Sequence, residues 1–75
     1  MPVMRIELDS DRTTARRVRD LHLAGRVHHD SRDAAREEAW RRGRTPIGEP
    51  VFVGTTNGDP VRLLYDVQVH LDTTG

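Results

Sequence analysis

Apolar and polar residues alternate along residues 61–71 of this chain. Every odd position in the stretch is apolar, and the even positions are polar with Leu64 as the one exception. A period of two is typical of a β-strand that buries one face and leaves the other in water. Such a strand cannot bury its apolar face alone, so the residues before it must supply the partners.

Two shorter stretches predict further strands. Residues 3–9 alternate apolar side chains with mostly charged ones, which indicates a strand with one wet face. Residues 51–53 are apolar and follow a proline, which strands permit at their first position. Residues 55–60 predict a turn, in which Asn57-Gly58 tolerates the positive φ of many hairpin turns. The strand at 61–71 is therefore expected to pair with 51–53 as a hairpin.

The first helix is predicted at residues 11–24. Ser10 is a suitable N-cap, and Gly25 is a suitable left-handed residue to end the helix. At 100° per residue one stripe of side chains faces the core. This stripe consists of Thr14, Ala15, Val18, Leu21 and His22.

A second helix is predicted to begin with Asp30 or Ser31 as its cap and to end near Arg42, before Gly43. Its apolar residues are few and do not define one face, so its orientation stays open. One continuous helix over residues 11–42 is the alternative, although the glycine between the two segments argues against it.

The order of the elements is β-α-α-β-β. It predicts a single α+β domain over residues 1–75, in which two helices cover one face of a three-stranded, mainly antiparallel sheet. Residues 72–75 are expected to be a frayed tail. Because the strand at 61–71 is longer than its predicted partners, part of it is expected to lack a neighbour, and an unpaired edge invites association.

The charges are uneven although the formal net charge is +0. All 12 basic residues other than histidine are arginine. They gather in the helical middle of the chain, whereas acidic residues exceed basic ones from residue 45 onward. Arginine binds phosphate and carboxylate groups bidentately, but a GC-rich genome also raises arginine content, and composition alone favours the second explanation.

The arrangement of the arginines separates two groups. In the second helix, acidic residues stand three or four positions before arginines and are expected to neutralise them. On the first helix, one outer face carries arginines with few acidic residues nearby. A second small arginine cluster lies at the end of the second helix. These candidate nucleic-acid contacts are Arg12, Arg16 and Arg19, with Arg41, Arg42 and Arg44.

Motifs for catalysis and cofactor binding are absent from the sequence. There is no cysteine, no nucleotide-binding glycine motif and no His-Glu-x-x-His. The run from His28 to Ser31 holds residue types of a catalytic triad, but the same run is typical of a helix start. A metal-dependent enzyme using His28, His29 and Asp30 stays a minor alternative, and we expect a non-catalytic protein without cofactors.

Self-association is the other prediction for the surface. By strand alternation, Val3, Phe52 and Leu64 fall on the wet face of the sheet, where they would form a small apolar patch. A chain this short buries little core, so a homodimer would add buried area. The sequence predicts a protein-interaction or regulatory module, homodimeric, with nucleic-acid binding as the alternative. Lacking a membrane-spanning stretch or a signal peptide, it is expected in the cytoplasm of a bacterium.

Overall fold

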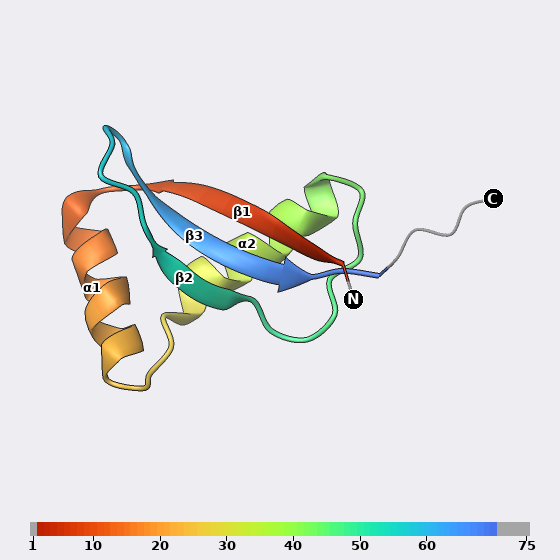
Figure 1. Ribbon diagram of the computed structural model, residues 1–75, viewed down its shortest axis with the longest axis horizontal. Coiled ribbons are helices and arrows are strands. Elements are labelled where there is room, and N and C mark those ends of the chain that lie inside the picture. The colour runs from red at the N-terminus through yellow and green to blue at the C-terminus, as the bar shows by residue number, and fades with distance from the viewer. Residues whose placement is uncertain (1, 71–75) are drawn as a thin grey trace.

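A computed structural model describes residues 2–70 of the chain. The elements along it are β1 (Val3–Ser10), α1 (Arg12–Leu23), α2 (His29–Arg41), β2 (Val51–Thr55) and β3 (Val61–Gln68). They form an α+β fold in the predicted order β-α-α-β-β, as Figure 1 shows. The predicted tail at 72–75 and the last residue of the predicted strand at 61–71 lie outside the described residues.

The sheet is antiparallel, and β3 runs through its centre in the order β1-β3-β2. All eight residues of β3 pair with β1, from Val3 opposite Gln68 to Ser10 opposite Val61. Beyond β3 the pairing continues as a bridge between Pro46 and Val69. Contrary to expectation, no part of β3 lacks a neighbour in the described residues, because β1 is as long as β3. The free edges belong to β1 and β2.

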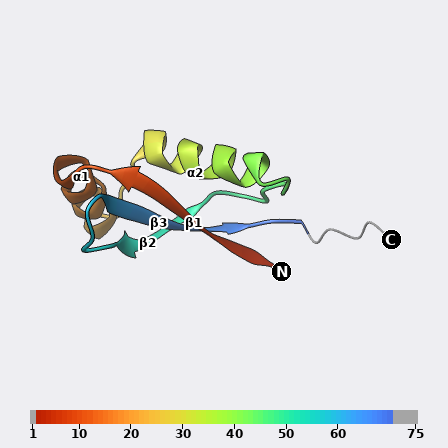
Figure 2. The same cartoon turned by 90° about the horizontal axis from the view of Figure 1, so that it is seen from above.

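Both helices contribute to one core on one face of the sheet. In Figures 1 and 2, α2 lies along the sheet and contacts β1 and β3, whereas α1 crosses its end and contacts β2 and β3. The opposite face of the sheet carries no helix (Figure 2). The core consists of Ile6, Ala15, Val18, Ala35, Ala39, Leu63, Tyr65, Val67 and Val69.

Helix α1 begins one residue later than predicted, with Asp11 rather than Ser10 as the N-cap. The Asp11 carboxylate accepts a hydrogen bond from the Thr14 backbone N–H at 2.6 Å, which satisfies a donor that the first turn leaves free. Gly25 has a φ of 73° and ends the helix in the left-handed conformation, as expected. Of the predicted core stripe, Ala15 and Val18 are buried as expected, whereas His22 is exposed.

Helix α2 starts at His29, and its N-cap is His28 instead of Asp30 or Ser31. The imidazole Nδ1 of His28 accepts the Ser31 backbone N–H at 3.2 Å, a role that carboxylates and hydroxyls more often fill. The orientation that the sequence left open is settled by Ala35 and Ala39. Both are 0% exposed, and they share the face that meets the sheet.

The β2–β3 hairpin contains a bulge between Phe52 and Gly54 and a loop over residues 56–60. Neither Asn57 nor Gly58 has a positive φ, contrary to the expectation for this turn, and the Asp59–Pro60 peptide bond is cis. The loop projects at the end of the molecule where α1 begins (Figure 1).

Candidate functional site

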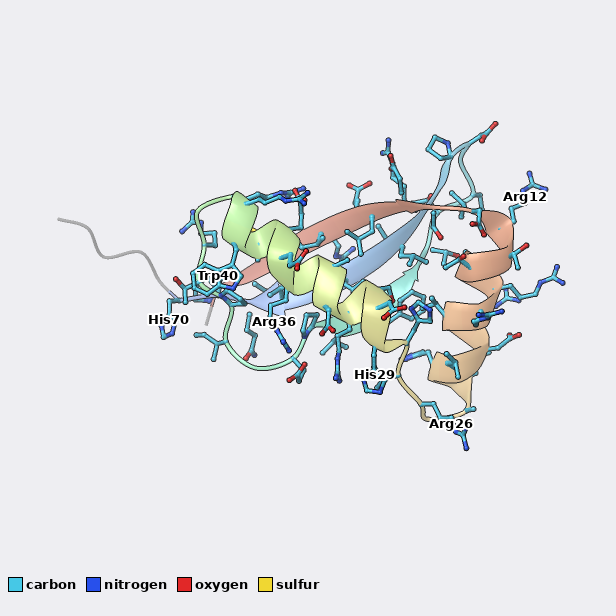
Figure 3. All side chains as sticks on the ribbon, turned by 180° about the vertical axis from the view of Figure 1, so that it is seen from behind. Arg12, Arg26, His29, Arg36, Trp40 and His70 are labelled. Carbon is cyan, nitrogen blue, oxygen red and sulfur yellow. The ribbon has the colours of Figure 1, made fainter. Side chains whose placement is uncertain are left out.

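Three of the predicted arginines line a cleft between α1 and the β2–β3 loop. Arg12, Arg16 and Arg19 stand on one side, and residues 55–58 stand on the other. The cleft has a volume of about 260 Å³, and Ala15 and Val61 also line it. In Figure 3, Arg12 projects from the first turn of α1 at this end of the molecule. The structure therefore adds a polar loop to the arginine face that helix periodicity predicted.

The arginines of this cleft differ from most others in their ion pairing. Within residues 2–70, Arg12, Arg16 and Arg19 have no carboxylate within 4.0 Å. Six other arginines do pair with carboxylates, as in Arg5–Asp66, Arg62–Asp9, Arg32–Glu49, Arg36–Glu49 and Arg42–Glu38. The positive charge of the cleft is thus available to an external anion.

Asp11, the acidic residue nearest in sequence to Arg12, is the N-cap of α1. Hydrogen bonding to the Thr14 N–H, and weakly the charge of Arg17, hold the pKa of Asp11 below its ordinary value. This carboxylate is ionised at neutral pH and caps α1. No guanidinium group of the cleft lies within 4.0 Å of it.

The second arginine cluster lies far from the first. Arg41 and Arg42 lie at the C-terminal end of α2, and both pair with Glu38, at 3.6 and 3.3 Å. Figure 3 labels Trp40, which marks this end, at the opposite end of the long axis from Arg12. Arg44 is exposed, and its backbone N–H donates to the Ala39 carbonyl oxygen at 3.0 Å, which places it beside the end of α2. The two predicted clusters therefore do not form one surface.

The face of the sheet without helices carries both ion pairs and apolar side chains. Val3 is 54% exposed there, and Leu64 is half-buried opposite Glu7 and Gly54. Val51 also lies on this face, 60% exposed, because it pairs with Asp66, whereas Val53 lies in the bulge and has no partner in the register. Val51 was missed from the sequence because all three residues of 51–53 are apolar and show no alternation.

Phe52 does not belong to that patch. Its Cα pairs with Tyr65, so it shares the core face of the sheet and is half-buried there. Its ring lies edge-on to Tyr65, with 5.5 Å between ring centroids, and edge-on to His22 at 5.3 Å. The prediction that Phe52 lies on the wet face was wrong. In the register with β3, Val51 lies opposite Asp66 on the wet face, and Phe52 therefore points to the core.

Ser31 links the start of α2 to the core through a short polar chain. Its hydroxyl lies 2.8 Å from His28 Nδ1 and hydrogen-bonds to the Tyr65 hydroxyl. Burial raises the pKa of the Tyr65 hydroxyl and outweighs its hydrogen bond with Ser31, which lowers this pKa. The Ser31 hydroxyl in turn lies 3.2 Å from the His28 carbonyl oxygen, to which it donates. The triad-like residue types of this run thus serve the helix start and the core.

No three histidine, aspartate or glutamate side chains of residues 2–70 converge on a position that could hold a metal ion. Neither helix of the described part is long and apolar enough to cross a membrane.

Comparison of the chain with models of known protein families, with curated proteins and with solved structures found no match.

Proposed function

We propose that this protein binds the phosphate backbone of a nucleic acid in the cleft between α1 and the β2–β3 loop. The supporting observation is that Arg12, Arg16 and Arg19 converge there without a carboxylate partner within residues 2–70. Guanidinium groups match phosphate oxygens bidentately, and this match is stronger than a contact between point charges. The net charge of +0 leaves the attraction local to this end of the molecule.

The aromatic residues indicate which part of the nucleic acid is recognised. Tyr65 is 2% exposed and Phe52 is half-buried, so neither ring is free to stack on a base. Trp40 is 57% exposed but lies at the other end of the molecule (Figure 3). Stacking is the main source of base contact in single-strand binding proteins. Binding is therefore expected to follow the backbone and to show little dependence on base sequence.

The dependence of binding on salt tests this proposal. Three neutralised phosphates predict a slope of about −2.7 in log K against log salt for duplex DNA, because bound phosphates release counterions. Arg16→Gln is expected to reduce the steepness of the slope by about one and to weaken binding about tenfold. Fluorescence anisotropy with a labelled oligonucleotide at several salt concentrations measures both quantities.

Arg44→Gln is the matched control. It removes the same charge from an exposed arginine beside the end of α2, and it should leave affinity and slope nearly unchanged. Equal losses of affinity in the two variants would show a general attraction to positive charge and would refute phosphate binding in the cleft. A slope of zero in the unsubstituted protein would refute phosphate binding altogether.

A homodimeric protein-interaction module is the second proposed function, and the face of the sheet without helices supports it. Val3 and Val51 are each more than half exposed on that face, and Leu64 is half-buried on it. The face also carries charges of both signs, in the pairs Arg5–Asp66 and Arg62–Asp9. Such a mixed surface can complement a second copy of itself across a two-fold axis.

Light scattering at high micromolar concentration tests the dimer, for which we expect twice the mass of one chain. Leu64→Asp is expected to weaken association at least about tenfold, because the interface would bury an unpaired carboxylate. Leu23→Asp is the matched control, since Leu23 is 77% exposed on α1 and should not affect association. A monomeric mass for the unsubstituted protein would refute this function.

A further inference from the structure

A second cavity lies where the end of α1, the start of α2 and β2 meet. It has a volume of about 220 Å³ and shares no lining residue with the arginine cleft. Its apolar part includes Val18 and Tyr65, each 2% exposed, and the half-buried Phe52. The edge-on packing of Phe52 against Tyr65 and His22 holds these rings in a fixed arrangement. A planar apolar group would therefore meet a preformed aromatic wall.

The polar lining of the same cavity is cationic or hydrogen-bonding. It comprises His22, Arg26, His28 and Arg32, and no aspartate or glutamate of residues 2–70 lines it. Arg32 is ion-paired with Glu49, 3.2 Å from its Nε, although this buried Nε makes no hydrogen bond within residues 2–70. Arg26 has no carboxylate within 4.0 Å in the described part of the chain. In Figure 3, Arg26 projects where the chain leaves α1 for α2.

We infer that this cavity binds a small aromatic carboxylate, with the ring against Phe52 and the carboxylate at Arg26. Small-molecule sites typically combine an apolar lining with a few convergent polar groups, and this cavity has both. Size limits the ligand to one ring. An apolar cavity of about 150 Å³ holds benzene, so 220 Å³ leaves room for one ring and its acidic group. The site is independent of the proposed phosphate cleft.

Titration of the full chain with benzoate, followed by amide chemical shifts, tests the inference. Millimolar binding is expected for a ligand of this size, with the largest shifts in residues 22–28 and around Phe52. Benzyl alcohol has the ring without the charge, and acetate has the charge without the ring, so both should bind at least about tenfold more weakly. Equal binding of acetate, or no shift at tens of millimolar benzoate, would overturn the inference.

Two variants separate this site from the arginine cleft. Arg26→Gln should weaken benzoate binding about tenfold through loss of a charged hydrogen bond, and it should leave nucleic-acid binding nearly unchanged. Arg12→Gln should do the reverse. Both side chains are exposed, so neither change threatens the fold. If Arg26→Gln left benzoate affinity unchanged, or if Arg12→Gln reduced it equally, the assignment of the carboxylate to Arg26 would be wrong.

Discussion

Ile6→Ala is expected to lower the free energy of unfolding by about 2–5 kcal/mol. Ile6 is 0% exposed in the middle of β1, opposite Tyr65 in the register with β3. The substitution leaves a cavity between the sheet and the helices, and the core has few large side chains that could move into it. Besides Ile6, the largest fully buried side chains within residues 2–70 are two valines, Val18 and Val67. A domain of 75 residues has a total stability of about 4–11 kcal/mol, so the loss is a large share of it.

Urea denaturation followed by circular dichroism measures this loss as a change in midpoint at constant slope. Val3→Ala is the matched control, because Val3 is a β-branched residue of the same strand and lies on the uncovered face, 54% exposed. It should change the free energy of unfolding by no more than about 0.5 kcal/mol. Similar losses in both variants would show that β1 does not distinguish a core face from a wet face.

The buried face of a strand could be predicted from the sequence only where apolar and polar residues alternate. Alternation identified β1 and β3 and the face that Ile6 and Val67 bury, because a strand shows every second side chain to the same side. The uninterrupted run Val51-Phe52-Val53 carries no such information. Which of its residues points inward is decided by the register with β3, a contact between distant parts of the chain.

The candidate sites show the same limit. Helix geometry alone places Arg12, Arg16 and Arg19 on one face, so the arginine row was predictable. The cleft was not, because its other wall is the β2–β3 loop, which only the tertiary fold brings beside α1. The same holds for the cavity around Phe52, whose lining comes from both helices and two strands. His28 as a helix cap was missed because propensity favours the neighbouring Asp30 and Ser31.

Ala35→Leu is expected to destabilise the protein by about 1–3 kcal/mol, because it overfills the contact between α2 and the sheet. Ala35 and Ala39 are both 0% exposed on the side of α2 that packs on β1 and β3. Their methyl groups let the helix backbone lie close to the strands. A leucine adds three carbon atoms where packing is already at the density of a crystal, so α2 must move outward.

Ala34→Leu makes the same chemical change one position away, where the side chain is exposed. Leucine and alanine have similar helix propensities, so this variant should stay within about 0.5 kcal/mol of the unsubstituted protein. Thermal and urea denaturation of the two variants therefore isolate the orientation of α2, which the sparse apolar residues of its sequence left undecided. If Ala34→Leu were the more damaging change, α2 would present a different face to the sheet. The polar chain from His28 through Ser31 to Tyr65 would then also need another arrangement, because it is set by the same helix rotation.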